Sequence, residues 1–294
     1  GAEGDGGVGR WSEFFEQQNE GGKRLASICH TRPSGAFFGL AQLSPFTRNS
    51  KAWKDLMALP SIEDRVNALR NETTRAKLIA EGIEAGDMKN LAHMLHPFGI
   101  DSKPNLDFAR QQSLLQLAEA EGKDPVEVYV ERLLASEGRE FFNFWMFGGN
   151  LDNQWKYMQL PHVVPMLGDA GAHVGFFTDT DSPTVLLSEL TREQGVYSLP
   201  EAVHRITGKS AAIIGLKERG ELREGWHADI NVIDYENLST CHPEYVNDFP
   251  HGGGRFVVKG KGYDATIVGG KVIIKNGKHT GHRPGRVIRE FVRG

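Results

Sequence analysis

A short apolar segment followed by a glycine turn and two helical segments constrains the fold of this chain most strongly. Residues 163–167 are Val-Val-Pro-Met-Leu, which predicts a buried strand. Residues 183–190 and 199–206 then carry apolar side chains at helical spacing. This order of strand, loop and helix predicts an α/β fold, and in a parallel α/β barrel the carboxyl ends of the strands form the catalytic face. We therefore expect Asp169 to lie at such a face, although aspartate and glycine also form ordinary turns.

Residues 1–216 otherwise combine helical patterns with a few strand patterns. A dense aromatic run at 141–147 predicts a buried strand, and Asp124 before Pro125 predicts the start of a helix. A strand is also expected at 24–30. Helices with one apolar face are expected at residues 11–24, 61–82, 107–121 and 125–136.

Residues 217–294 change to short alternating runs, which predict a small β-domain. Gly269 and Gly270 stand between two of these runs and are typical of a hairpin turn. The chain is therefore expected to divide into 1–216 and 217–294. The expected strands of the second part are 229–234, 255–259, 265–268 and 271–275.

Charge and cysteine content argue against several classes of protein. The net charge of −4 has mixed signs, so the chain offers no broad basic surface for nucleic acid. It contains no apolar run of about 18 residues, the length that a membrane span requires. Cys29 and Cys241 are the two cysteines and lie far apart, which argues against a disulfide framework. The cytoplasm is the expected compartment.

Several motifs occur in an order and spacing that resemble one known family. They are Arg-Pro-Ser-Gly-x-x-x-Gly-Leu at 32–40, Ser-Pro-Phe at 44–46, Gly-Asp-Ala-Gly-Ala-His-Val at 168–174, Asp179, Pro-Thr-x-Leu-Leu at 183–187, Gly-Leu-x-x-Arg-Gly at 215–220, Gly-x-x-Ala-Asp-Ile-Asn-Val-Ile-Asp at 225–234, Gly-Tyr-x-Ala-Thr-Ile-Val-x-Gly at 262–270 and Thr-Gly-x-x-Pro-Gly-Arg at 280–286. Together they are similar to the middle and the end of N-acyl-D-amino-acid deacylases, within the amidohydrolase superfamily.

The resemblance implies a metal-dependent-hydrolase TIM barrel with a small β-sandwich. It starts about halfway along the family, and no His-x-His occurs in this sequence, whereas the family carries that metal-binding motif on its first barrel strand. We therefore expect a carboxyl-terminal half: residues 1–216 as the later βα units of a partial barrel, and residues 217–294 as a portion of the sandwich. An amino-terminal half chain or a second copy of this chain is the expected partner.

The resemblance also implies a reaction and roles for five residues. The expected activity is hydrolysis of the amide bond in an N-acyl-D-amino acid or a related N-acyl compound, in which Asp169 is the general acid and base beside a metal-activated water. One or two zinc ions are expected, held mainly by the missing half, with Asp169 and His30 as ligands from this chain. His173 is a catalytic candidate, and Arg32 and Asp179 are candidates for binding the substrate.

Other interpretations stay open at this point. His30 and His173 could be ordinary histidines bonded to backbone, Arg32 could form a structural ion pair, and Asp179 could be solvated. The chain as a whole could be a non-catalytic fragment or interaction subunit without a metal site. It could also hydrolyse cyclic amides or other C–N bonds. The helical pair His93 and His96 lacks a third ligand and predicts only a helix end.

Overall fold

The computed structural model describes residues 8–100, 104–165, 168, 171–289 and 291 and shows a mixed α/β chain, as the sequence predicts. Its centre contains β1 (Ser27–Cys29) and β5 (Val163–Pro165), which pair in parallel with Ser27 opposite Val163. Because the two strands run in the same direction, His30 and the segment after Pro165 leave the pair at the same end.

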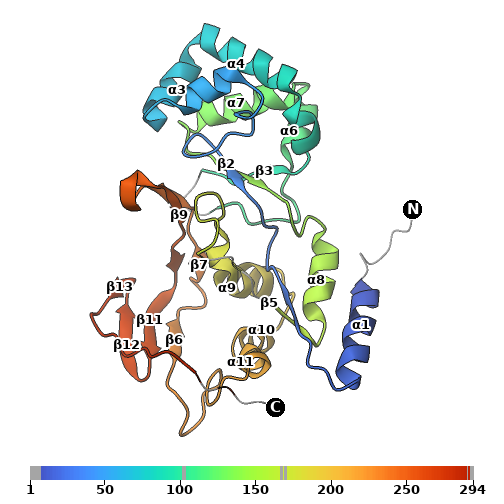
Figure 1. The fold of residues 1–294 in the computed structure, drawn as a ribbon, viewed down its shortest axis with the longest axis vertical. Helices are drawn as coiled ribbons and strands as arrows, with labels where there is room; N and C mark the ends of the chain where they lie inside the picture. Colours follow the sequence, from blue (N-terminus) through green and yellow to red (C-terminus); the bar gives the residue numbers. More distant parts are fainter. Residues whose placement is uncertain (1–7, 101–103, 166–167, 169–170, 290, 292–294) are drawn as a thin grey trace.

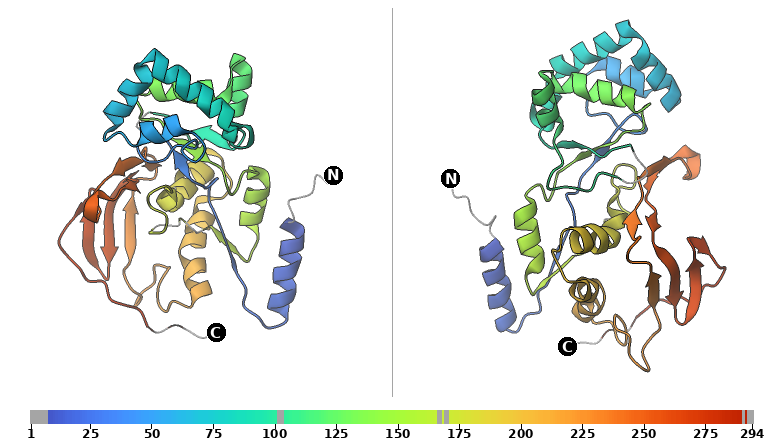
Figure 2. Two further views of the ribbon diagram at one scale, coloured as in Figure 1. Left: turned by 45° about the horizontal axis from the view of Figure 1, so that its top comes forward. Right: turned by 180° about the vertical axis from the view of Figure 1, so that it is seen from behind.

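Several helices pack around this strand pair. In Figures 1 and 2, α9, α10 and α11 lie between α8 and the strands of the carboxyl-terminal part, and α1 lies beside α8. The segment expected to be helical at 183–190 is a short α-helix that continues as a π-helix. The bounds are α1 (Val8–Glu20), α8 (Leu151–Gln159), α9 (Ser182–Val185), the π-helix η2 (Leu186–Glu193), α10 (Leu199–Ile206) and α11 (Gly208–Ile214).

A helical unit forms the end of the molecule shown at the top of Figure 1. Its core is built around Trp53, Leu69 and Tyr129, which are all fully buried. Its helices are α2 (Lys51–Met57), α3 (Ile62–Arg70), α4 (Glu72–Ala85), α5 (Asp87–Leu91), α6 (Leu114–Glu121) and α7 (Pro125–Ala135). The helix expected at 107–121 is shorter than the pattern predicts, because the Ser113 side chain accepts a hydrogen bond from the Gln116 backbone and starts α6 there.

A three-stranded antiparallel sheet connects this helical unit to the rest of the chain. Its strands are β2 (Phe37–Phe38), β4 (Phe142–Phe144) and β3 (Leu95–Pro97), in that order. The prediction of a buried aromatic strand at 141–147 is right for Phe142, which is fully buried. It is wrong at the end of the run, where Phe147 is 51% exposed because the ladder of β4 has already stopped.

The carboxyl-terminal part is a set of short antiparallel strands. The hairpin prediction is confirmed: Gly269 and Gly270 both have positive φ and join β11 (Tyr263–Val268) to β12 (Lys271–Lys275). These two strands form a sheet with β6 (Ile230–Ile233) and β13 (Lys278–His279) in the order β13-β12-β11-β6. Two further pairs are β7 (Ser239–Thr240) with β10 (Gly260–Lys261), and β8 (Glu244–Val246) with β9 (Arg255–Val257).

Two expectations from composition can be compared with the described residues. None of the helices in the described ranges is both long and apolar enough to cross a membrane. Cys29 and Cys241 are both half-buried free thiols.

Candidate functional site

Asp169, the predicted general base, lies outside the described residues, but its neighbours define where its segment is attached. β5 ends at Pro165, and the chain is described again at Gly168 and from Gly171 onward. A β-carbon built on Gly168 would lie 2.7 Å from the carbonyl oxygen of Asp179, which is closer than real side chains approach. The residue before Asp169 therefore packs directly against the backbone of Asp179, and this close approach requires glycine.

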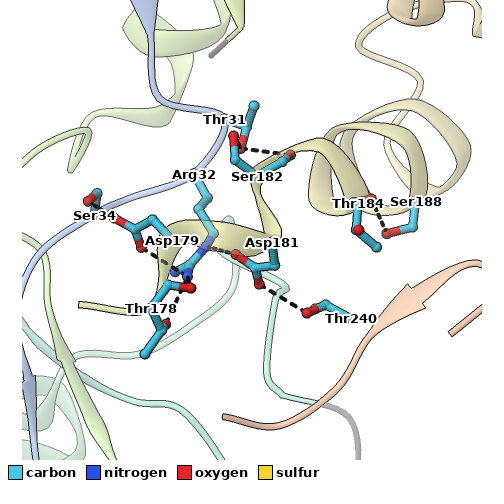
Figure 3. Close-up of polar contacts among 10 residues, drawn as sticks. All are labelled: Thr31, Arg32, Ser34, Thr178, Asp179, Asp181, Ser182, Thr184, Ser188 and Thr240. Atoms are coloured by element: carbon cyan, nitrogen blue, oxygen red, sulfur yellow. Dashed lines mark hydrogen bonds and ion pairs between the residues drawn. The ribbon is translucent and has the colours of Figure 1, made fainter. Parts of the chain in front are cut away.

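Eight polar side chains, each at most 7% exposed, meet beyond the carboxyl end of β1, and we call them the polar cluster (Figure 3). Three follow β1, four lie around the short 3-10 helix η1 (Asp179–Asp181) and the start of α9, and one belongs to β7. The members are Thr31, Arg32, Ser34, Thr178, Asp179, Asp181, Ser182 and Thr240.

Arg32 is the centre of the polar cluster. Its side chain is 2% exposed, and its guanidinium lies between two carboxylates: Nη2 is 3.0 Å from Oδ1 of Asp179, and Nε is 3.2 Å from Oδ1 of Asp181. Nη2 also donates to the backbone carbonyl and the hydroxyl of Thr178, at 3.3 and 3.2 Å. The planar fork of arginine suits such divided pairing, because its donors point in fixed directions.

The two carboxylates of the polar cluster, those of Asp179 and Asp181, also accept hydrogen bonds from hydroxyl groups. Ser34 donates its hydroxyl to Oδ2 of Asp179, and Thr240 donates to Oδ2 of Asp181 at 3.1 Å. Burial raises the pKa of Asp179 above its ordinary value, while the positive charge of Arg32 and the bond from Ser34 oppose that shift. The charge pairing and hydrogen bonds of the cluster thus offset part of the cost of burying its carboxylates.

The polar cluster joins the segment after β1 to the start of α9. Thr31 donates to the backbone carbonyl of Ser182 at 3.2 Å, and the two hydroxyls are 3.0 Å apart. Figure 3 shows these contacts beside those of Arg32, so residues 31–34 and 178–182 are bound at several points. The loop between β5 and η1 is therefore held in place at its carboxyl-terminal end.

His30, the predicted metal ligand, lies between β1 and this cluster. Its ring is half-buried and stacks on Phe147, with ring centroids 6.0 Å apart and planes 4° apart. Its carbonyl oxygen accepts a hydrogen bond from Nε2 of Gln154 at 2.6 Å. His30 is close enough to Asp179 for its charge to lower the pKa of that carboxyl slightly. It is therefore placed at the same end of the strand pair as Gly168.

His173, the second catalytic candidate, lies on an exposed turn. Its φ is 52°, in the left-handed region, and its carbonyl oxygen accepts hydrogen bonds from the backbones of Phe176 and Phe177 at 2.9 and 3.0 Å. The turn is attached to two strands: the Phe37 backbone donates to Phe176, and the Phe256 backbone donates to Val174, both at 2.8 Å. His173 is thus on a well-anchored turn on the solvent side of the loop.

The described residues do not make up a metal site by themselves. Within the described ranges, no group of three or more His, Cys, Asp or Glu side chains is close enough together to hold a metal ion. Asp169, the other predicted ligand, is outside these ranges.

Sequence reasoning singled out Arg32 and Asp179 but not the residues that join them. Ser34 belonged to the motif at 32–40 without a predicted role, Thr178 and Asp181 belonged to no motif, and the whole helical unit separates Arg32 from Asp179 and Asp181 in the sequence. The sequence offered one signal for these residues. Asp179 and Asp181 stand two residues apart just before Ser182 and Pro183, a position typical of the start of a helix. Nothing in that signal identified Arg32 as the partner.

Comparison with known proteins places these features in a family context. The model of a family described as "Amidohydrolase family" matches residues 36–274. An N-acyl-D-aspartate deacylase from Alcaligenes xylosoxydans xylosoxydans is 38% identical over 106 residues, which cover 36% of this chain and 19% of that protein. A dihydroorotase from Endomicrobium trichonymphae is 36% identical over 94 residues, covering 31% of this chain and 21% of that protein.

Two solved structures are similar at lower identity. N-acyl-D-glutamate deacylase from Bordetella bronchiseptica, complexed with zinc and a phosphonate inhibitor, has a TM-score of 0.48 and 17% identity, and the match covers 97% of this chain and 47% of that one. A D-aminoacylase has a TM-score of 0.37 and 17% identity, with 71% of this chain and 51% of that one covered. The chain thus spans about half the length of these structures and about a fifth of the two curated relatives.

Proposed function

This chain belongs to the amidohydrolase family, and on that premise we propose that it takes part in hydrolysis of the amide bond of N-acyl-D-amino acids or related N-acyl compounds. The observation that supports the proposal is the parallel pairing of β1 with β5, since His30 directly follows β1 and Gly168, the residue before Asp169, lies three residues beyond the end of β5. The carboxyl ends of parallel strands are where α/β folds place their catalytic groups. The similarity to an N-acyl-D-aspartate deacylase supports the choice of substrate class.

In the proposed mechanism, this chain supplies the proton transfers. Asp169 takes a proton from the attacking water and returns it to the nitrogen of the leaving amine, which a carboxylate within hydrogen-bond reach can do. His173 is proposed to hydrogen-bond Asp169 or the substrate from the neighbouring turn. A zinc ion, when bound, would lower the pKa of the water. The described residues do not complete a site for it, so we assign His30 and Asp169 to zinc only together with ligands from outside this chain.

The proposal extends to the architecture. β1 and β5, with the helices that follow them, are proposed to belong to a partial TIM barrel within residues 1–216. The strands of residues 217–294 are proposed to form a portion of a β-sandwich. An amino-terminal half chain is proposed to complete the barrel and to supply most zinc ligands, and a second copy of this chain is the alternative partner.

The test is amine release from a panel of N-acyl-D-amino acids, with added zinc, by the unsubstituted chain and by Asp169→Asn, each assayed together with its partner chain. Removing a general acid and base is expected to lower kcat about 10²–10⁴-fold. Asp152→Asn, which changes an exposed carboxylate on α8, is the control and is expected to keep full activity. Unchanged activity in Asp169→Asn would contradict the mechanism.

Two alternatives have observations of their own. The similarity to a dihydroorotase supports hydrolysis of a cyclic amide, so cyclic imides belong in the same panel. The lack of a His-x-His motif in this sequence is the observation behind a non-catalytic subunit. Metal analysis of the chain purified with its partner chain separates the second alternative, because a non-catalytic assembly would contain no zinc and would release no amine from any substrate.

A further inference from the structure

We propose that Arg32 and Asp179 are positioning residues: the polar cluster holds Gly168, to which the proposed general acid and base Asp169 is directly bonded. This inference rests on the proposed function of Asp169 as general acid and base. It gives Arg32 and Asp179 a role different from the substrate contact predicted from sequence, and the experiment below separates the two.

The first argument is the path of the loop. The chain leaves β5 at Pro165, passes Gly168, and returns to the cluster at Thr178 and Asp179. Gly168 packs so tightly on the carbonyl of Asp179 that a β-carbon would lie 2.7 Å from that oxygen. The backbone of Asp179 is therefore the surface against which the residue before Asp169 rests. A displacement of Asp179 passes to Asp169 through one peptide unit.

The second argument is how firmly Asp179 is held. Its side chain is 3% exposed and has two partners from the segment after β1, the guanidinium of Arg32 and the hydroxyl of Ser34. Arg32 in turn is fixed by Asp181, which accepts a hydrogen bond from Thr240 of β7. The position of Asp179 is thus determined by two other parts of the chain, one after β1 and one in the carboxyl-terminal strands.

The third argument concerns geometry and charge. Arg32 uses Nε for Asp181 and Nη2 for Asp179, so one rigid planar group sets the separation of the two carboxylates. Lysine keeps the charge but has a single ammonium on a flexible stem and cannot reproduce that arrangement. A shift of about 1 Å in a catalytic group can lower a rate about 10²-fold, so the fixed separation has a catalytic consequence.

The alternative role for Arg32 is direct contact with the substrate, and one observation is compatible with that role. Nη1 of Arg32 is buried and has no hydrogen-bond partner within the described part of the chain. If Nη1 bound a substrate carboxylate, a substitution would mainly raise KM. If Arg32 acts through Asp169, it would mainly lower kcat, because the substrate contact is intact while the proton transfer is misaligned.

The molecule offers a matched control in Arg205. Its side chain is 6% exposed, its Nε is 2.6 Å from Oε1 of Glu201, and its guanidinium donates to the carbonyls of Met158 and Val163. These contacts lie at the amino end of β5, the end opposite to the Asp169 segment. A substitution there disturbs an equally buried arginine network but leaves the polar cluster untouched.

The experiment compares the unsubstituted chain, Arg32→Lys and Arg205→Lys by steady-state kinetics and by urea unfolding. We expect kcat of Arg32→Lys to fall at least about 10-fold with KM changed less than about threefold, while Arg205→Lys keeps kcat within about threefold. Equal loss of kcat in both variants would show that the polar cluster contributes only to general stability, and this would overturn the proposal. A rise in KM alone for Arg32→Lys would overturn it in favour of substrate contact.

Hydrogen exchange provides a second measurement that does not depend on turnover. The Phe176 and Phe177 amides donate to the His173 carbonyl within the same loop. They are expected to exchange at least about 10-fold faster in Arg32→Lys than in Arg205→Lys. Equal exchange would refute the positioning role, whether or not the chain is active. An unsubstituted chain that is inactive together with its partner chain would instead refute the proposed function. Ser34→Ala, which removes one donor and no charge, replaces Arg32→Lys if that variant does not fold.

Discussion

At the scale of single residues, His96 makes the stability of this chain sensitive to acid. Its ring is 6% exposed and stacks on Trp145, with centroids 3.6 Å apart and planes 9° apart. Burial lowers its pKa from 6.5 to about 4. Between these values the unfolded chain binds a proton that the folded chain does not bind. The contribution of His96 to stability is therefore present above the upper value and is lost as the pH falls through this window.

The substitution His96→Phe is expected to keep the stacked ring and remove this pH dependence. The free energy of unfolding of the unsubstituted chain should decrease by up to about 1.4 kcal/mol per pH unit more steeply than that of the variant across the window. Urea unfolding at several pH values within and above the window measures the difference. His93→Gln, at an exposed position on the turn before β3, is the control. Parallel pH profiles for His96→Phe and the unsubstituted chain would contradict the prediction.

Gly168 supplies a second test at this scale. Gly168→Ala places a methyl group 2.7 Å from the carbonyl oxygen of Asp179, so the backbone on one side has to move. Such overpacking is expected to cost about 1–3 kcal/mol of unfolding free energy, and under the proposed function it also lowers kcat. Gly175→Ala is the matched control in the same loop, because its methyl group would meet only the Gly254 carbonyl at an ordinary 3.6 Å. Urea unfolding of both variants decides the comparison, and equal stabilities would refute the steric argument.

The sequence singled out several residues of the polar cluster and its surroundings but could not identify their contacts. The structure places Arg32 and His30, which follow β1, near Asp179 of η1. The pairing of Arg32 with Asp179 and Asp181 could not be predicted, because it joins segments on either side of the helical unit. A carboxylate in a polar loop is usually solvated, and only the tertiary packing shows that Asp179 is buried.

At the scale of secondary-structure elements, α7 tests how far a local signal determines stability. The Asp124 side chain accepts a hydrogen bond from the Val126 backbone, the Asp124 backbone N–H donates to Oε2 of Glu127, and Pro125 occupies the first turn. Asp124→Ala removes this cap and is expected to lower the unfolding free energy by about 1 kcal/mol. Asp124→Asn keeps an equally good cap and is the control. Urea unfolding of both variants measures the effect, and equal stability would show that packing alone fixes the start of α7.

The bounds of an element could be predicted where they depend on a local sequence signal. They could not be predicted where they depend on pairing with strands from other parts of the chain. The start of α7 and the turn at Gly269 and Gly270 follow from cap and turn chemistry, and both are confirmed. The aromatic run at 141–147 shows the other case. Its hydrophobicity is uniform, but β4 extends only as far as β2 and β3 can pair with it, which leaves Phe147 exposed. Neither the ends of β4 nor the π-helical turn at Leu186–Glu193 has a local sequence signature.

At the scale of the whole molecule, β1 leaves apolar surface uncovered, whereas its partner β5 is buried. Within the described part of the chain they pair only with each other, so each has an edge without a neighbouring strand. Ile28 in the middle of β1 is 51% exposed, and α1 has no buried residue, with Trp11 46% and Phe14 43% exposed. Such exposure of a strand in a parallel pair is unusual, because parallel sheets are normally covered on both faces. Unpaired edges beside exposed apolar side chains favour association with another chain.

This reasoning predicts that Ile28→Lys weakens association without unfolding the chain. A charged side chain at a strand edge opposes pairing, whereas Ile28 already contacts solvent in the folded chain, so the unfolding free energy is expected to change by less than about 0.5 kcal/mol. Sedimentation velocity over a range of concentrations measures the association of the unsubstituted chain, of Ile28→Lys and of Leu222→Lys. Leu222 is 76% exposed and lies on the connection after α11, away from the strand pair, so its variant controls for added charge. Association that is equally strong in all three proteins would rule out the β1 edge as the contact, and the search for the partner surface would move to α1.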